Sequence, residues 1–485
     1  MSSTPVRVRI APSPTGDPHV GTAYVALFNR THARQSAGQF LLRIDDTDRT
    51  RYQATSEEKI FEALGWLGLD WDEGPDCGGP CAPYRQSERN QIYRSHTDLL
   101  LERGAAYRCF CSPERLAEVR QGQKQRKERF GYDGACRDLD AGDSQKRASA
   151  GDPHVIRLRV PETGETRFID QIRGEIVVQN AEIDDQVLIK SDGFPTYHLA
   201  NVVDDIEFGI TDVLRAEEWL ISTPKHVLIY QALEQPLPRF FHVPLLRNAD
   251  QSKISKRKNP VSLDWFREQG YLKEALLNFL ALMGWSPPDE EEVFDLDRFQ
   301  QEFRIEDIST GAPVFDLTKL DWLNGMHIRK LDLEQLLQRI ADEGFLPQGV
   351  TPSQAAAVLP LVVERMVRLA DFETKTTWFF SQPEPPTAED LVPRKGSPEQ
   401  SLEALQATSG LLNSDLPFQG EAIAEALDGL LAEKQWKKPL LFMPLRFALT
   451  SRSDSPDLIE VMVVLGRDRV IERIERAIEI LKSAP

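Results

Sequence analysis

The chain has 485 residues, of which 41% are hydrophobic and 28% charged. This length exceeds what one hydrophobic core supports, so we expect three to five domains of about 100–150 residues. The net charge of −18 taken alone argues mildly against a nucleic-acid partner, because phosphate binding rewards a basic face. Net charge does not describe how charges are distributed, however, so a nucleic-acid partner stays compatible with the composition.

Neither a membrane span nor a targeting segment is indicated. The longest apolar run, Ala355–Val363, is broken by Pro360 and is far shorter than the ~20 residues that a span needs. The N-terminal residues Met1–Pro5 carry no basic and apolar signal. Five cysteines, an odd number, favour a reducing compartment. We expect a cytoplasmic protein that does not bind membranes.

The first elements follow a strand–helix–strand order. Val6–Ile10 and Phe40–Ile44 are strand-like and flank an apolar-periodic helix at about Thr22–Ala37. This order predicts a βαβ unit of a parallel sheet. Buried parallel strands are usually apolar throughout, so Arg9 is out of place. It lies next to a Pro/Gly loop, where a parallel sheet opens its ligand crevice.

The pattern changes beyond a further predicted helix at Glu57–Leu69. From about Asn90 to Asp192, helices mix with short strand-like pieces such as His154–Leu158 and Glu175–Val178. This segment is typical of an inserted module, and α/β character resumes from Phe194 to about Leu246.

The remainder of the chain, after Asp264, is predicted to be helical. Four segments space apolar residues at i, i+3 and i+4, namely Leu272–Met283, Leu333–Ile340, Ala422–Glu433 and Asp468–Leu481. A Pro-rich stretch, Gln382–Pro398, is expected to link two helical pieces.

Two short motifs far apart in the sequence suit the same chemistry. His19 and Gly21 precede a predicted helix, where free N–H groups and the positive helix end attract phosphate. Lys253 and Lys256 lie in a polar segment and can contact charge that develops as pyrophosphate leaves. Alone, the first motif is also compatible with a turn and the second with a basic surface loop. Together they favour a nucleotide site.

Longer strings identify a family. His19-Val20-Gly21 resembles the "HIGH" signature of class I aminoacyl-tRNA synthetases, and Lys253–Arg257 resembles their "KMSKS" loop. Three further stretches resemble bacterial glutamyl-tRNA synthetases, and the resemblance covers essentially the whole chain: Arg43–Arg49, Pro195–Asp205 and Arg215–Trp219.

The resemblance implies a Rossmann-like α/β catalytic core with an inserted α+β module, followed by all-α C-terminal domains. We expect the core in 1–92 and 194–247, the acceptor-end-binding module in 93–193, a stem-contact domain in 248–330, and helical anticodon-binding domains in 331–390 and 391–485.

The resemblance also implies the reaction. Members of the family join L-glutamate to ATP, which Mg²⁺ accompanies, and pass the glutamyl group to the terminal adenosine of tRNA. The partners are thus ATP, glutamate, and the acceptor end and anticodon of tRNA, and we expect a monomer. Charging of glutamate tRNA alone and charging of glutamine tRNA as well are both compatible with the sequence.

Site residues follow by resemblance. Arg9 and Arg215 take the side-chain carboxylate, since guanidinium groups bind carboxylates by bidentate hydrogen bonds. Asp45 stands where known family members carry Glu. The other expected contacts are Ala11, Ser13 and Asp45 around the amino end, Tyr197, Asn201 and Trp219 shaping the pocket, and His19, Gly21, Glu218, Lys253 and Lys256 at the nucleotide.

The cysteines allow two interpretations. Cys109, Cys111 and Cys136 resemble a zinc site of some relatives, whose fourth ligand, a His, is replaced here by Asp138. Asp138 or the phenol of Tyr132 can complete a zinc site. The alternative is three free thiols.

Three other functions compete with this hypothesis. A glutaminyl-tRNA synthetase would carry a β-barrel C-terminal region, whereas 399–485 is predicted to be helical. The short tRNA-modifying paralogue lacks the ~200 C-terminal residues present here. An inactive tRNA-binding relative would not need His19, Lys253 and Arg215 together.

Overall fold

The computed structural model describes residues 5–48, 51–255 and 259–483. It divides into two compact units, Met1–Glu268 with Lys273–Leu320 (unit 1), and Gln269–Leu272 with Asp321–Pro485 (unit 2). Among the described residues, no helix is both long and apolar enough to cross a bilayer. The six-part domain division expected from the sequence stays a prediction.

The N-terminal βαβ unit of unit 1 is confirmed. Strands β1 (Arg7–Ile10) and β2 (Gln39–Leu42) pair in parallel, and helix α1 (Val20–Gln35) connects them. The helix begins two residues earlier than predicted because the His19 side chain accepts a hydrogen bond from the N–H of Gly21 and so caps it.

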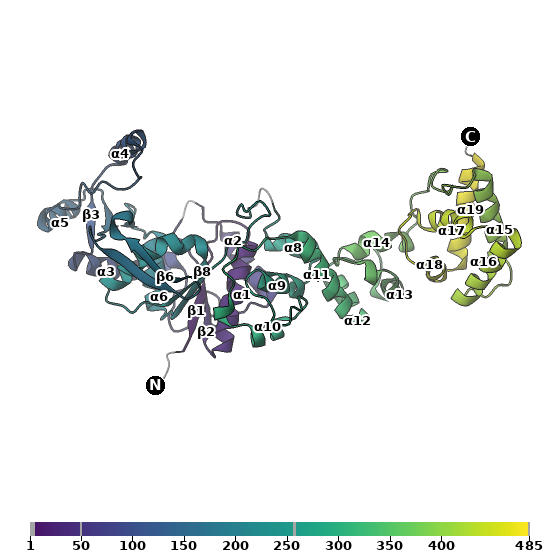
Figure 1. Cartoon of the computed structure of the whole chain (residues 1–485), viewed down its shortest axis with the longest axis horizontal. Helices are drawn as coiled ribbons and strands as arrows, with labels where there is room; N and C mark the ends of the chain where they lie inside the picture. The colour runs from purple at the N-terminus through teal and green to yellow at the C-terminus, as the bar shows by residue number, and fades with distance from the viewer. Residues whose placement is uncertain (1–4, 49–50, 256–258, 484–485) are drawn as a thin grey trace. The chain divides into compact units, whose positions relative to one another are not determined.

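Unit 1 also contains a four-stranded sheet with strand order β6-β5-β9-β8, of which Figure 1 labels β6 and β8. Strands β8 and β9 are parallel, as are β9 and β5, whereas β5 and β6 are antiparallel. The chain leaves the carboxyl end of β8 directly into η3. The elements are β5 (Glu165–Asp170), β6 (Gly174–Gln179), β8 (Asp212–Ala216), β9 (Arg239–Val243), η3 (Glu217–Ser222), α6 (Tyr197–Glu207) and α7 (Thr223–Ala232).

The middle of unit 1 also holds a three-stranded antiparallel sheet of order β3-β4-β7. Its core includes Leu100, Leu158 and Leu188, which are fully or almost fully buried. The elements here are α3 (Asn90–Glu102), β3 (Ala106–Cys109), α4 (Pro113–Arg126), α5 (Ala141–Ser149), β4 (Val155–Leu158), η2 (Asn180–Glu182) and β7 (Val187–Ile189).

Aromatic packing joins α1 to helix α10 (Leu296–Glu302) and to the residue that follows it. The ring of Phe28 meets those of Phe299 and Phe303 edge to face, with centroids 5.6 and 5.2 Å apart. The remaining elements around this core are α2 (Ala54–Leu67), η1 (Gln86–Glu88), α8 (Leu263–Glu268), α9 (Lys273–Leu282), η4 (Ile305–Asp307) and α11 (Leu317–Lys330), which ends in unit 2.

Beyond α11 every assigned element of the described residues is a helix, in agreement with the predicted helical tail. Buried Leu405, Leu445, Leu449 and Ile474 belong to its main core. The elements are α12 (Leu333–Asp342), α13 (Pro352–Val362), η5 (Val363–Arg365), α14 (Asp371–Phe380), α15 (Pro398–Leu412), α16 (Gly420–Lys434), α17 (Lys438–Thr450), α18 (Leu458–Leu465) and α19 (Arg467–Ser483).

One buried arginine ties unit 2 together. Arg473 is 2% exposed and donates hydrogen bonds to the carbonyl oxygens of Leu449, Trp378 and Ser381 at 2.5, 2.7 and 3.0 Å. Its side chain therefore joins α17, α14 and the residue that follows α14 to α19.

Candidate active site

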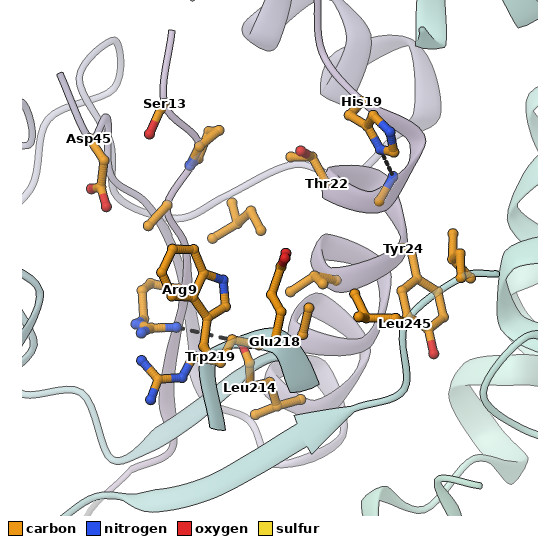
Figure 2. Close-up of a pocket in the computed structure, with 18 of the residues that line it drawn as sticks. Arg9, Ser13, His19, Thr22, Tyr24, Asp45, Leu214, Glu218, Trp219 and Leu245 are labelled. Atoms are coloured by element: carbon orange, nitrogen blue, oxygen red, sulfur yellow. Dashed lines mark hydrogen bonds between the residues drawn. The ribbon is translucent and has the colours of Figure 1, made fainter. Parts of the chain in front are cut away.

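A cavity of about 360 Å³ lies where the βαβ unit meets β8 and η3. In Figure 2, Ser13 and Asp45 stand on one side of it and His19 and Thr22 on the other, with Glu218 and Trp219 between them. The predicted site residues that line it are Arg9, Ala11, Ser13, His19, Gly21, Asp45, Tyr197, Asn201, Arg215, Glu218, Trp219 and Lys253. Lys256 lies outside the described residues.

The imidazole of His19 has a fixed orientation at the start of α1. Its Nδ1 accepts the Gly21 N–H at 2.9 Å, as Figure 2 shows, so the neutral ring carries its hydrogen on Nε2. A side chain at position 21 would place its Cβ 3.1 Å from this Nδ1. Glycine at this position therefore avoids a tight contact with the capping ring, which presents a donor nitrogen beside the positive helix end.

The segment after Lys253 is attached to the His19 loop. The N–H of Val20 donates to the Val261 carbonyl at 2.7 Å, and the N–H of Leu263 donates to the Pro18 carbonyl at 3.0 Å. Lys253 itself pairs with Glu218, Nζ to Oε2 at 2.5 Å. Both motifs that the sequence singled out thus reach one cavity.

Arg9 is buried and already paired. Its Nε and one terminal nitrogen donate to the two carboxylate oxygens of Asp205 at 2.9 and 3.1 Å, and the same terminal nitrogen lies 3.4 Å from the Asn201 amide oxygen. This pairing explains how an arginine is tolerated in β1 with 4% exposure.

Asp205 belongs to a larger buried ion network. Arg43 donates to Asp205 at 3.0 Å and to both oxygens of Asp45 at 2.7 and 3.1 Å. Arg89 donates to Asp204 at 2.7 Å, which also lies 3.6 Å from Arg43. Burial raises the pKa of Asp45 to about 6 in spite of Arg43. The negative charge of Asp45 therefore develops near that pH.

Arg215, at the end of β8, has a different environment. It is 5% exposed, and its hydrogen bonds go to neutral groups. Nε donates to His242 Nε2 at 3.0 Å, and the terminal nitrogens donate to the Thr223 hydroxyl at 2.8 Å and to the Tyr197 hydroxyl and His226 Nδ1 at 3.2 Å each. No carboxylate of the described residues forms an ion pair with it.

Aromatic rings close the cavity beside Arg215. The centroids of Tyr197 and Trp219 lie 4.3 Å apart, and Trp219 is 36% exposed. Burial raises the pKa of Tyr197, so its hydroxyl stays protonated and can donate to a ligand. This corner combines an apolar wall, one positive charge and a hydroxyl donor.

Several lining residues were not predicted. Thr22, Tyr24 and Val25 come from α1, and Leu214 and Leu245 come from the other wall. Tyr24 is 2% exposed, and its hydroxyl has no hydrogen-bond partner among the residues that the structure describes. One sequence signal could have indicated Thr22, Tyr24 and Val25. They directly follow the His19 motif in the predicted helix, and this start of α1 faces the cavity.

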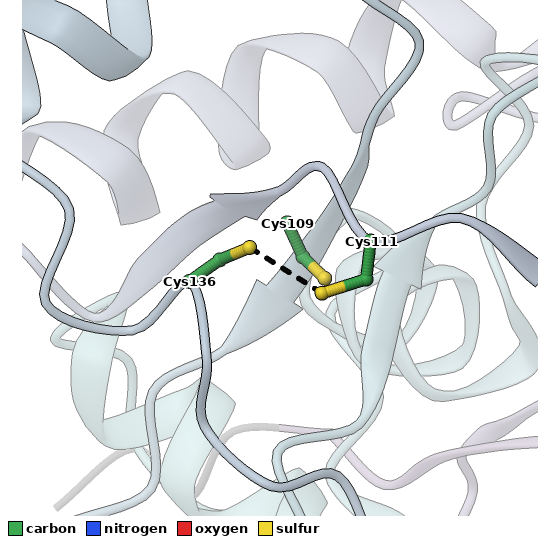
Figure 3. Close-up of side chains that lie close together, drawn as sticks. All are labelled: Cys109, Cys111 and Cys136. Atoms are coloured by element: carbon green, nitrogen blue, oxygen red, sulfur yellow. Dashed lines mark hydrogen bonds between the residues drawn. The ribbon is translucent and has the colours of Figure 1, made fainter. Parts of the chain in front are cut away.

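The three predicted cysteines meet at the end of β3. The Sγ atoms of Cys109, Cys111 and Cys136 lie within 4.8 Å of one another, and those of Cys111 and Cys136 are 3.5 Å apart (Figure 3). The Tyr132 hydroxyl oxygen lies 3.3 and 3.4 Å from the Sγ atoms of Cys109 and Cys111.

Asp138 is not part of this cluster. Its side chain is 87% exposed and lies 3.8 Å from Arg159. Tetrahedral zinc with Zn–S bonds of ~2.3 Å separates sulfurs by roughly 3.8 Å, which the thiol cluster can provide. Of the two candidates for a fourth ligand, the geometry favours Tyr132.

Comparisons with known proteins agree with this arrangement. Residues 5–322 match the family model "tRNA synthetases class I (E and Q), catalytic domain", and residues 332–478 match "Anticodon binding domain". The chain is 48% identical to the glutamate–tRNA ligase of Thermus thermophilus and 46% identical to that of Fusobacterium nucleatum. These alignments cover 98% of this chain in both cases, and 100% and 97% of the two relatives.

Solved structures give the same result. A glutamate–tRNA ligase from Elizabethkingia meningosepticum, crystallised with its amino acid, superposes with a TM-score of 0.89 at 34% identity, covering 99% of this chain and all of the other. The chain therefore belongs to the glutamate–tRNA ligase family of class I aminoacyl-tRNA synthetases.

Proposed function

We propose that this enzyme activates L-glutamate with ATP to glutamyl-adenylate and transfers the glutamyl group to the 3′-terminal adenosine of glutamate tRNA. The observation that carries the proposal is one cavity lined by Arg215, His19 and Lys253. An acidic amino acid and a nucleotide can meet there. Catalysis then needs positioning and charge neutralisation, without a protein nucleophile.

At the amino-acid end, Arg215 and Arg9 receive the side-chain carboxylate, and Tyr197, Asn201 and Trp219 shape its pocket. Ala11, Ser13 and Asp45 surround the amino group. In support, Asp45 stands at the cavity side with Ser13 (Figure 2), where an ionised carboxylate can hold an ammonium group.

At the nucleotide end, His19 donates from Nε2 to a phosphate oxygen, and Gly21 lets the nucleotide approach the backbone. Lys253 and Lys256 neutralise the leaving pyrophosphate. Glu218 lies beside the nucleotide and holds Lys253 until ATP arrives, in keeping with their 2.5 Å ion pair. Mg²⁺ bound with ATP supplies additional neutralisation of phosphate charge.

The tRNA contacts two regions. The acceptor end meets the inserted module, and the anticodon meets the helical unit. In support of the second contact, a cavity of about 310 Å³ in unit 2 is lined by Arg365, Lys375, Arg452 and Trp378. The three basic side chains can contact the phosphates of a nucleic acid. Charging of glutamate tRNA and glutamine tRNA, assayed side by side, distinguishes the two specificities.

We propose further that Cys109, Cys111, Cys136 and Tyr132 hold a structural zinc ion in the inserted module, which would cross-link the end of β3 to the segment after α4. We also propose that the enzyme acts as a monomer in the cytoplasm. Metal analysis and light scattering of the purified protein test the zinc and the monomer.

The decisive assay is glutamate-dependent ATP–pyrophosphate exchange with tRNA present. We expect exchange with glutamate and much less with glutamine. Lys256→Ala should slow adenylate formation far more than it weakens glutamate binding. Equal losses in both would contradict the role of Lys256, and no exchange by the intact enzyme would leave an inactive tRNA-binding relative as the better description.

A further inference from the structure

The group that most clearly selects the substrate's charge is Arg215, and its own support lies outside the cavity. Asp170 and His242 are both fully buried, as is Thr223, and His226 is 1% exposed. None of these four residues lines the cavity. They come from β5, β9 and α7, which surround the end of β8.

We propose that the buried Asp170–His242 pair, with Thr223 and His226, positions Arg215 through neutral acceptors, so that its positive charge is left for the substrate's side-chain carboxylate. The inference rests on the proposed function, since it names the groups that set glutamate specificity at the same site.

The hydrogen bonds fix the state of His242. Asp170 Oδ2 accepts from His242 Nδ1 at 2.6 Å, so that nitrogen carries the hydrogen. Nε2 must then be the acceptor that faces the Nε–H of Arg215 at 3.0 Å. A buried carboxylate that orients an imidazole and sets its tautomer is a familiar device in enzymes.

Asp170 is itself held rigidly. Its Oδ1 accepts the backbone N–H groups of Ile172 and Arg173 at 3.1 and 2.9 Å, and its Oδ2 also accepts the N–H of His242 at 3.2 Å. The carboxylate is thus saturated by donors and separated from Arg215 by the imidazole. It orients the arginine's partner without pairing with the arginine.

The second arm consists of two histidines. Arg215 donates to His226 Nδ1, so His226 carries its hydrogen on Nε2 and donates to His198 Nδ1 at 3.2 Å. Burial, followed by the charge of Arg215, lowers the pKa of His226 far below its ordinary value. Burial likewise lowers the pKa of His242 and of His198 to about 4. Around neutral pH all three rings remain neutral acceptors.

The charges around the pocket support the same conclusion. Arg9, Arg43 and Arg89 form a network with Asp45, Asp204 and Asp205. When the three aspartates are ionised, this network is neutral. Arg215 lies outside this network, and the imidazole of His242 separates it from the Asp170 carboxylate, so no carboxylate of the described residues contacts the guanidinium and a substrate carboxylate can take that place.

This arrangement explains discrimination between an acid and its amide. Four of the five N–H donors of Arg215 are used by neutral groups, so few free donors remain and charge is the main recognition element. The Tyr197 hydroxyl accepts a hydrogen bond from Arg215, and its own O–H can therefore donate a hydrogen bond to the ligand. Glutamine would leave the buried guanidinium without a carboxylate in direct contact, which is costly.

The test uses the full-length enzyme with Thr223→Val, which keeps the side-chain shape but removes the acceptor, and His242→Phe, which keeps a ring but removes both nitrogens. Thr223→Ser restores the hydroxyl, and Gln231→Ala, at an exposed position on the same helix, is the matched control. Glutamate and glutamine binding are measured by calorimetry, and KM and kcat by pyrophosphate exchange.

We expect Thr223→Val to raise the glutamate KM about tenfold, as loss of one hydrogen bond to a charged group predicts, and His242→Phe to raise it more. The ATP KM should stay unchanged, selectivity over glutamine should fall, and Thr223→Ser should recover most of the loss. Parallel damage to ATP and glutamate parameters, or an unchanged glutamate KM in folded Thr223→Val, would overturn the inference.

Failure of the proposed function has a different signature. In that case the intact enzyme shows no glutamate-dependent exchange, while calorimetry still compares glutamate binding by the variants. An intact enzyme that binds neither amino acid would count against both the function and the role of Arg215.

Discussion

Each unit of the molecule contains an arginine that is buried and has no carboxylate partner among the described residues, but the two serve different ends. Arg215 in unit 1 donates to four side chains and lines the large cavity. Arg473 in unit 2 donates to three main-chain carbonyl oxygens that come from two helices and the residue after one of them. Burial lowers the pKa of both.

The difference shows that an unpaired buried arginine does not by itself indicate a ligand site. Main-chain carbonyls at helix ends need donors, and Arg473 satisfies them, so its role is to stabilise the fold. The acceptors of Arg215 are side chains that could have been replaced by a carboxylate. Their neutrality leaves the guanidinium without a carboxylate in contact, in keeping with the proposed role of a substrate carboxylate as its partner.

The largest expected effect on activity comes from removing the positive charge of Arg215. Arg215→Gln should lower kcat/KM for glutamate about a thousandfold, equivalent to ~4 kcal/mol, because the substrate carboxylate loses its counter-charge. Melting temperature should fall much less, because removing a buried charge without an ion-pair partner offsets the loss of donors to the four side-chain acceptors. Exchange kinetics and thermal melting measure both quantities. A melting temperature that falls as severely as activity would erase the contrast with Arg473.

The second arginine should behave in the opposite way. Arg473→Met removes the donor from two buried carbonyls, those of Leu449 and Trp378, and from the partly buried Ser381 carbonyl. It should lower the free energy of unfolding by roughly 2–4 kcal/mol, while the glutamate KM stays unchanged. Urea denaturation provides the measurement. Arg469→Met is the matched control, because Arg469 is exposed and donates to the single carbonyl of Phe379. Equal destabilisation by both variants would remove the special role of Arg473.

The pH dependence of glutamate binding tests the proposed contact between Asp45 and the substrate's amino group. The raised pKa of Asp45, about 6, means that ionisation of this group opposes folding as pH rises from about 4 through 6. The ionised form is nevertheless the one that holds the substrate's ammonium group. Glutamate KM should therefore rise roughly tenfold per pH unit below 6, and Asp45→Asn should abolish that dependence. A flat profile in the intact enzyme would remove Asp45 from the site.

The smallest expected effect on catalysis concerns the thiol cluster of Cys109, Cys111 and Cys136, which has a different proposed role from either arginine. Tyr132→Phe should weaken zinc retention during dialysis against a chelator roughly 10–100-fold and leave the glutamate KM as it is. Zinc content by mass spectrometry measures the change, with Asp138→Asn as the control. Loss of zinc in the control rather than in Tyr132→Phe would exchange the two candidates for the fourth ligand.

Much of the fold could be predicted because its signals are local. The βαβ unit, its Pro/Gly loop and the helical tail follow from periodicity and turn residues. Bounds differed where tertiary contacts decide them, as at α1, whose start is set by the ring of His19. The parallel pairing of β5 with β9 joins distant residues and leaves no local pattern.

The candidate site was partly predictable for the same reason. Arg9 stood out as a charge in an apolar strand, and His19 and Lys253 belong to recognisable strings. Asp170, Thr223 and His242 form no motif, because they meet only when three elements fold around the end of β8. Their chemistry depends on which atoms face each other, and sequence spacing does not contain that information.

Position 21 has a consequence for anyone who engineers the enzyme for heat resistance. Replacing a glycine near a helix start by alanine normally favours the helix by up to ~1 kcal/mol. Here the added methyl would lie only 3.1 Å from Nδ1 of the imidazole, and the ring would have to shift by a few tenths of an ångström. A mutation chosen to stabilise the fold would thereby move the His19 imidazole, the group proposed to bind the nucleotide.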